Sequence, residues 1–253
     1  KTKPFRAKDP QEVFADMDRF AKRYPQTRRV FLMDGDALVL ANEKLVPILK
    51  KLQQAFPKLS RVSAYANGSN FKRKSDEDLA ELYRHKLSLI YMGLESGSQK
   101  VLDHCGKTSS VEDMVEAVRR AEKAGIRSSV IVLLGLGGKK DSGEHVRGTI
   151  EALHRMKPRY LSFLSLMVIP GTPLAEEVGR GEFVELNSQE LLQEAHDILQ
   201  GLELEHTIFR SNHASNYLPL EGTLPKDKPE LLKVLKAGLE GKLWLRPEGW
   251  RGL

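Results

Sequence analysis

Short apolar runs and amphipathic stretches alternate along most of this 253-residue chain. A short apolar run bounded by glycine or polar residues is typical of a buried strand, and apolar side chains repeated every three or four positions predict a helix. Their alternation predicts β–α units around a parallel sheet, and hence an α/β barrel or part of one. The predicted strands are residues 29–33, 61–66, 87–92, 128–134, 160–168 and 206–210. The predicted helices are residues 9–24, 42–56, 76–84, 98–105, 142–156, 188–202 and 228–239, with a further helix ending near residue 125.

Polar, glycine-rich turns follow several of the predicted strands. They include Asp34-Gly35-Asp36, Asn67, the turn at residues 95–98 and the turn at residues 135–138. In parallel α/β barrels the carboxyl ends of the strands meet at one mouth, which carries the active site. We therefore expect these turns to converge on a ligand with hydroxyl and ammonium groups, which carboxylates bind well. Asp34 and Asp36 are equally compatible with simple N-capping of helices.

The most informative of these turns closes the apolar strand that ends near residue 92. Gly93 and Gly97 allow the backbone to approach a ligand closely, and Glu95 can accept hydrogen bonds from hydroxyl groups. Ser96 and Ser98 suit the N-cap of the following helix. An ordinary strand-to-helix turn with a solvated glutamate would have the same residues.

The composition permits several classes of protein and excludes others. Forty basic against 34 acidic side chains give a net charge of +6, which allows a polyanionic partner without requiring one. The single cysteine, Cys105, excludes an internal disulfide framework and a multi-cysteine metal site within these residues. No apolar run is long enough for a membrane span, and we expect a soluble, cytoplasmic protein.

Together, the order and spacing of the strand-end motifs resemble the radical S-adenosylmethionine superfamily. The resemblance is to the branch that includes oxygen-independent coproporphyrinogen oxidases and methylthiotransferase-like enzymes, and it covers roughly residues 1–175. It implies a partial (β/α)6 barrel, with residues 1–205 as the barrel core and residues 206–253 as a C-terminal extension packed on it. Pro-Gly-Thr-Pro at residues 170–173 is also typical of the family.

The resemblance also implies roles for individual residues around S-adenosylmethionine. Asp34-Gly35-Asp36 takes the place of a Gly-Gly-Glu-like motif that holds the methionyl amino group. Glu95, in the motif that contains Ser96, is the expected ribose contact, and Lys107 would approach the cofactor carboxylate. The residues implied to complete the site are Ser63 or Asn67 at the ribose, and Leu134, Gly135 and Leu136 near the adenine.

The implied chemistry is reductive cleavage of S-adenosylmethionine, bound to a [4Fe-4S] cluster, to methionine and a 5′-deoxyadenosyl radical that abstracts a hydrogen atom. An electron donor such as a flavodoxin or ferredoxin would supply the electron. The family's CxxxCxxC cluster loop is absent, and residues 1–6 resemble what normally follows it. We expect a truncated or disordered N-terminal segment carrying the first strand and this loop, because its loss would expose a strand edge; a relative that has lost the cluster is the alternative.

Several other interpretations stay open. His213, in a polar loop after the last predicted strand, is a candidate for substrate chemistry or a satisfied loop histidine. Tyr65 and Tyr91 are candidates for the barrel interior or for core packing. A cluster-less, aldolase-like barrel would explain the strand-end carboxylates, but the chain shows no clear metal-ligand spacing. A nucleic-acid-binding module, or part of a tRNA-modifying protein, would need basic residues interleaved with aromatics, whereas the aromatics lie mainly in apolar runs.

Overall fold

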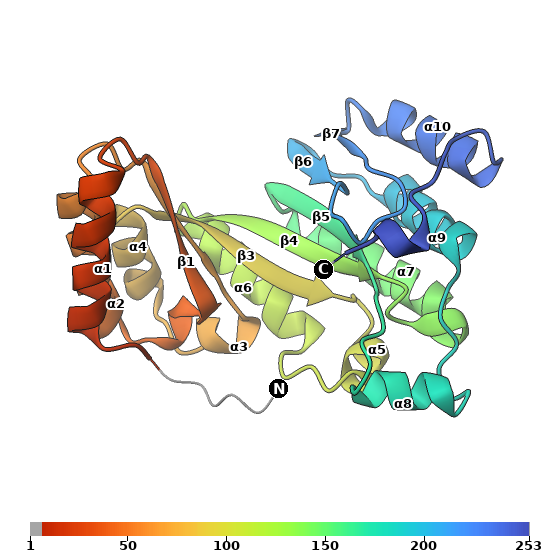
Figure 1. Cartoon of the computed structure of the whole chain (residues 1–253), viewed down its shortest axis with the longest axis horizontal. Helices are drawn as coiled ribbons and strands as arrows, with labels where there is room; N and C mark the ends of the chain where they lie inside the picture. The colour runs from red at the N-terminus through yellow and green to blue at the C-terminus, as the bar shows by residue number, and fades with distance from the viewer. Residues whose placement is uncertain (1–6, 253) are drawn as a thin grey trace.

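One seven-stranded sheet, in the order β1-β2-β3-β4-β5-β6-β7, organises the molecule (Figure 1). The structure is a computed structural model that describes residues 7–252; the segment at residues 1–6, which we expected to follow the cluster loop, lies outside the described residues. Strands β1 to β6 pair in parallel, and β7 pairs antiparallel with β6. The strands are β1 (Arg29–Asp36), β2 (Arg61–Tyr65), β3 (Leu87–Glu95), β4 (Arg127–Leu134), β5 (Tyr160–Ser165), β6 (Thr207–Arg210) and β7 (Glu221–Leu224).

Helices connect the successive parallel strands, and this gives the β–α order that the hydrophobic pattern predicts. Their starts follow from local side chains: Ser75, Ser110 and Asn187 each form a capping box with the residue three positions on. The helices are α1 (Pro10–Arg23), α2 (Asn42–Ala55), α3 (Gly68–Phe71), α4 (Asp76–Arg84), α5 (Gln99–His104), α6 (Val111–Lys123), α7 (Gly138–Met156), α8 (Pro173–Gly179), α9 (Ser188–Gly201) and α10 (Lys228–Leu239), with short 3-10 turns η1 (Ala37–Val39) and η2 (Glu248–Trp250).

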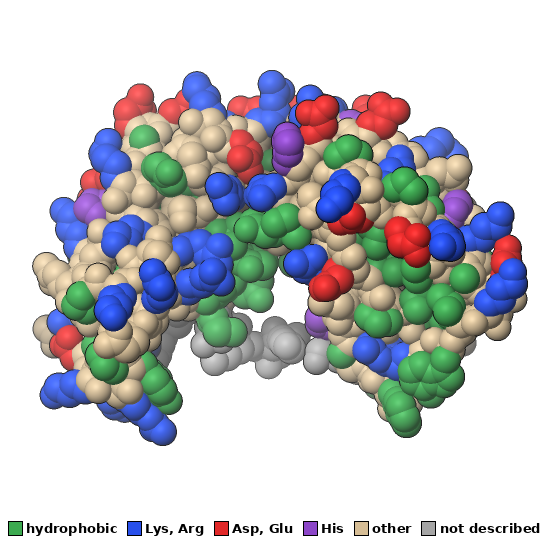
Figure 2. Space-filling model, turned by 90° about the horizontal axis from the view of Figure 1, so that it is seen from above, with side chains coloured by type: hydrophobic (Ala, Val, Ile, Leu, Met, Phe, Trp, Pro, Cys, Tyr) green, Lys and Arg blue, Asp and Glu red, His purple; other side chains and the backbone are tan. Residues whose placement is uncertain are grey.

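The two faces of the sheet have different surroundings. Alternate strand residues such as Val62, Ile90 and Val130 are fully buried in the core with apolar residues of the helices. The other alternate positions face away from this core and form a concave face. Figure 2 shows the result as an arch with a hollow lined largely by hydrophobic side chains. Within residues 7–252, β1 has no partner strand on its outer edge, so the sheet remains an open, partial barrel, as predicted.

Two elements of the C-terminal half were not predicted. Strand β7 contains Gly222 and has no alternation of apolar residues, so the sequence gives no signal for it. It is a strand because it pairs antiparallel with β6. Helix α8 begins at Thr172 and Pro173, which are a side-chain N-cap and a proline at the first turn. Strand β5 also ends at Ser165, before the predicted end at residue 168. The predicted boundary between residues 205 and 206 falls just before β6.

Candidate functional site

The carboxylate of Glu95 lies at the carboxyl end of β3, on the concave face. The register of β3 against β4 shifts by one residue between Gly93 and Glu95. Glu95 has a φ of 62°, an uncommon backbone conformation for a residue with a side chain. A Cβ atom at Gly93 would lie 2.1 Å from Glu95 Oε1, so the carboxylate folds back over Gly93. Glycine at position 93 therefore leaves the space that the Glu95 side chain fills.

Lys107 completes this site from the loop after α5. Its Nζ lies 3.1 Å from Glu95 Oε1, and the two side chains remain 28% and 26% exposed. The structure thus brings together the two residues to which the resemblance assigned the ribose and carboxylate contacts. An adjacent carboxylate and ammonium group suit a zwitterionic ligand that also carries hydroxyls, because each has a complementary partner.

The turn beyond Glu95 is fixed against α7. Ser96 is fully buried; its Oγ accepts a hydrogen bond from Ser98 N and lies 2.8 Å from His145 Nδ1. Gly97 N donates to Thr149 Oγ1 at 3.0 Å. Ser98 caps α5, as predicted, by accepting from Val101 N. Ser96 therefore stabilises the turn through its contacts with Ser98 and His145. Its predicted contact with the cofactor stays a prediction.

A buried His–Glu pair lies under the turns that follow β3 and β4. Glu194 of α9 accepts hydrogen bonds from Gly135 N at 2.5 Å and Ser142 Oγ at 2.6 Å. Burial raises the pKa of Glu194 to about 7 and lowers the pKa of His145 to about 4. His145 Nε2 lies 3.7 Å from Glu194 Oε2, but the two side chains do not form an ion pair because His145 is neutral. If the Ser96 hydroxyl donates to Nδ1, the Nε2–H faces Glu194.

Sequence reasoning missed both members of this pair, although a signal was present. Glu194 lies on the apolar stripe of α9, three residues after Leu191 and four before Ile198, and His145 lies four residues before the buried Thr149 on α7. A titratable side chain on the buried stripe of a helix requires a partner. In this protein, Glu194 holds the backbone of the β4 turn.

The three predicted residues at the end of β4 and in the following turn, Leu134, Gly135 and Leu136, have different surroundings. Leu134 belongs to the hydrophobic core and is 3% exposed. Gly135 has a φ of 83°, and a Cβ there would lie 2.8 Å from Leu191 Cδ2. Leu136 lines a separate cavity of about 650 Å³ beside α5 and the start of α7, together with Lys100. The predicted contacts of these residues with adenine stay predictions.

At the β1–β2 end of the mouth, Asp36 holds the backbone together. Its Oδ1 accepts from Leu38 N at 2.8 Å, and its Oδ2 accepts from Asn67 N at 2.7 Å and Asn70 Nδ2 at 2.6 Å. The N-cap interpretation of Asp36 is therefore confirmed. Ser109 donates to the side chain of Asn67. The remaining predicted residues of this region are Asp34 and Gly35 in β1 and the buried Ser63 in β2.

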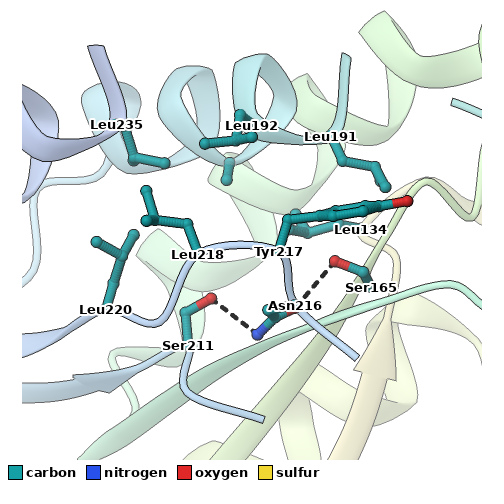
Figure 3. Close-up of a pocket in the computed structure, with 11 residues that line it drawn as sticks. Leu134, Ser165, Leu191, Leu192, Ser211, Asn216, Tyr217, Leu218, Leu220 and Leu235 are labelled. Atoms are coloured by element: carbon teal, nitrogen blue, oxygen red, sulfur yellow. Dashed lines mark hydrogen bonds between the residues drawn. The ribbon is translucent and has the colours of Figure 1, made fainter. Parts of the chain in front are cut away.

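The loop that contains His213 follows β6 and is held by internal hydrogen bonds. His213 Nδ1 lies 3.0 Å from Ser215 Oγ and accepts from Ser215 N. Asn216 accepts from Ser165 Oγ and donates to Ser211 Oγ, as Figure 3 shows. The cavity in that view is only about 20 Å³, enough for about one water molecule. The loop is thus a packed structural element.

Two arginines of the C-terminal segment, Arg246 and Arg251, form hydrogen bonds with the backbone of the His213 loop. Arg246 donates to the carbonyl oxygens of Ala214 and Asn216 at 2.6 and 2.9 Å. Arg251 donates to the carbonyl oxygens of Ser215 and Leu166 at 2.7 and 2.8 Å. Cation–carbonyl bonds of this kind satisfy backbone acceptors that the irregular loop leaves unpaired.

The described residues offer no site for a metal cluster. Cys105 is exposed, and among the side chains that the structure describes no group of three or more His, Cys, Asp or Glu is placed to hold a metal ion. In the same range, no helix is both long and apolar enough to cross a membrane.

An open α/β barrel with a charged pair at a strand end is the class of protein that these observations define. A family model described as the Radical SAM superfamily matches residues 1–153. The chain belongs to the radical SAM superfamily, as the strand-end motifs indicated.

The similar proteins compared with this chain are distant and longer. An uncharacterised protein of Methanocaldococcus jannaschii is 28% identical over 155 residues, which cover 61% of this chain and 44% of that protein. The heme chaperone HemW of Bacillus subtilis is 22% identical over 185 residues, covering 73% and 48%. The structure of archaeal Elp3 from Methanocaldococcus infernus superimposes with a TM-score of 0.62 at 15% identity, covering 92% of this chain and 59% of that one. The chain thus spans less than half of these two curated relatives.

Proposed function

We propose that this chain is the S-adenosylmethionine-binding part of a radical SAM enzyme, with the cofactor held at the carboxyl end of β3. The half-buried Glu95–Lys107 pair over Gly93 is the observation that carries the proposal. The carboxylate suits the ribose hydroxyls, and Lys107 suits the cofactor carboxylate. S-adenosylmethionine therefore fits the donor set of this end of the sheet.

A [4Fe-4S] cluster does not fit the described residues, whose one cysteine is exposed. Its ligands would have to come from outside residues 7–252. When bound and reduced by one electron, S-adenosylmethionine supplies a 5′-deoxyadenosyl radical that abstracts a hydrogen atom from a substrate. A flavodoxin or ferredoxin is the proposed source of the electron.

The residues of this chain would bind, orient and shield. Glu95 would fix the ribose, and Lys107 would neutralise the cofactor carboxylate. Ser96 and Glu194 would act through the backbone, because they hold the turns after β3 and β4 in place. The apolar side chains of the concave face would exclude water from the radical (Figure 2).

Calorimetric titration with S-adenosylmethionine tests the proposal. We expect Glu95→Gln to weaken binding by about tenfold, since a hydrogen bond to a charged group contributes roughly 1.5–3 kcal/mol. Glu112→Gln is the matched control, because Glu112 forms an exposed ion pair with Arg155 on α7. Equal affinities of Glu95→Gln and wild type, or no binding by the wild type, would contradict the proposal.

A further inference from the structure

The concave face carries a cluster of three aromatic rings on adjacent strands. Phe31, Tyr65 and Tyr91 come from β1, β2 and β3, with ring centroids 4.9, 5.2 and 6.2 Å apart. Tyr65 remains 44% exposed although its ring packs against both neighbours. Because the helices pack on the opposite face of the sheet, these rings lie on the concave face. Tyr65 and Tyr91 thus line the barrel interior, one of the two interpretations of the sequence.

Three arginines lie on the same face, nearer the amino ends of the strands. Arg29 and Arg61 are direct neighbours in the pairing of β1 with β2. They precede ring residues of their own strands by two and four positions, and side chains at this spacing share a face. Arg127 is the partner of Leu89, which lies two residues before Tyr91. Arg29 is one position on this face, about 7 Å, from Phe31, and Arg61 is two positions, about 13 Å, from Tyr65, a span that two long side chains and one nucleotide can bridge.

The charges of these arginines are unmatched among the residues that the structure describes. In the described part of the chain, no ion pair joins Arg29, Arg61 or Arg127 to a carboxylate. The Nε of Arg61 is buried and has no hydrogen-bond partner among the same residues. Like charges on neighbouring strands and a buried unpaired donor both destabilise a fold. A bound anion would relieve both.

We propose that the hollow binds a nucleotide unit of the substrate, with phosphate on Arg29 and Arg61 and the base against the rings of Tyr65 and Tyr91. Guanidinium groups bind phosphate in a bidentate manner, and bases stack on aromatic side chains. The proposal rests on the proposed function, because Tyr91 and Glu95 are four residues apart on the same face of β3. The nucleotide is either free or part of a single strand.

The combination of groups selects this ligand. Rings alone suit any flat apolar molecule, and arginines alone suit any anion, whereas the two side by side suit a molecule that carries both. S-adenosylmethionine also carries a base and an anionic group, but its single carboxylate is assigned to Lys107 at the carboxyl end of β3, which leaves Arg29 and Arg61 for a second ligand. The apolar runs hid this arrangement from sequence reasoning, because alternate residues of a strand point to opposite faces.

Fluorescence anisotropy with a short fluorescein-labelled oligouridine tests the proposal. We expect the double variant Arg29→Gln, Arg61→Gln to bind about tenfold more weakly at low salt, with a salt slope shallower by roughly 0.7 for each phosphate that the variant no longer neutralises. The matched control is Arg119→Gln with Arg147→Gln, which removes the same charge from exposed positions on helices. An equal loss of affinity in both double variants would mean that binding follows net charge and would overturn the proposal.

The base contact has its own variants. Tyr65→Ala should weaken binding of the oligouridine by about tenfold and leave binding of an abasic strand unchanged, while Tyr65→Phe keeps the ring and the affinity. Polyglutamate should bind weakly and without dependence on Arg61. Polyglutamate binding as tight as the oligouridine, or an unchanged affinity in Tyr65→Ala, would overturn the stacking role.

Two further measurements separate the possible results. Uridine monophosphate is used to displace the labelled oligouridine. Displacement at concentrations similar to those of unlabelled oligouridine indicates that the ligand is a free nucleotide, and much weaker displacement indicates a single strand. Both results support a nucleotide site. Calorimetry with S-adenosylmethionine on the Arg29, Arg61 double variant should give the wild-type affinity. If the wild type binds S-adenosylmethionine but no uridine ligand, this inference fails and the proposed function stands.

Discussion

Two strand-end carboxylates that look alike in the sequence have different situations in the structure. Asp36 at the end of β1 accepts hydrogen bonds from the backbone N–H groups of Leu38 and Asn67 and from the side chain of Asn70, and these join the end of β1 to the start of α3. Glu95 at the end of β3 contacts the ammonium group of Lys107 and stays partly exposed. The comparison teaches that acceptor capacity left over after folding, and not the presence of a carboxylate, marks the position that can bind a ligand.

The largest expected effect on stability comes from replacing Asp36. Asp36→Ala removes a cap and leaves two donors unsatisfied, and we expect the free energy of unfolding to fall by about 3 kcal/mol in urea denaturation. Asp18→Ala, which removes one exposed ion pair with Lys51, is the control and should change stability by less than about 0.5 kcal/mol. A similar small change for Asp36→Ala would mean that its hydrogen bonds contribute little.

The second prediction concerns how the free energy of unfolding depends on pH, through the buried side chains of His145 and Glu194. The pKa of Glu194 is raised to about 7, so the folded state binds the extra proton and stability falls as pH rises from about 4.5 to 7. The pKa of His145 is lowered to about 4, so the unfolded state binds the extra proton and stability rises as pH rises from about 4 to 6.5. The two slopes oppose each other in the wild type.

Single variants should therefore reveal each slope. Glu194→Gln leaves the His145 slope, and stability should decrease by roughly 3 kcal/mol on acidification from pH 6.5 to 4. His145→Gln leaves the opposite slope between pH 4.5 and 7. Urea denaturation across this pH range measures both, and parallel pH profiles in the two variants would contradict the assignment.

The fold was more predictable than the site, for reasons visible in particular residues. Short apolar runs predicted β1 to β6, and the predicted cap Ser98 marked the start of α5, because these signals act over a few neighbouring positions. Gly125, predicted as a helix stop, follows α6 with a φ of 86°. The roles of Asp36 and Glu194 depend on partners 31 and 59 residues away, at Asn67 and Gly135, and no local pattern contains them.

Gly93→Ala tests whether the position of the Glu95 carboxylate matters for binding, and its expected effect on stability is smaller. The added Cβ would occupy the place of Glu95 Oε1, and the side chain can rotate away, so we expect the free energy of unfolding to fall by about 1 kcal/mol. Displacing the carboxylate should nevertheless weaken S-adenosylmethionine binding about as much as Glu95→Gln does. Gly179→Ala is the control, because its Cβ would meet open space. Unchanged affinity in Gly93→Ala would show that the position of Glu95 is unimportant for binding.

The smallest expected effect on stability concerns Lys107. Since both side chains of the Glu95–Lys107 pair are more than a quarter exposed, solvent screens their attraction, and Lys107→Met should change the free energy of unfolding by less than about 1 kcal/mol. The same variant should weaken S-adenosylmethionine binding severalfold, because the cofactor carboxylate loses its cation. A double-mutant cycle with Glu95→Gln separates the two, as stability coupling should be near zero while binding depends on both residues. A large stability coupling would mean that Glu95 and Lys107 together hold the fold, as Asp36 does, and would contradict their assignment as a ligand-binding pair.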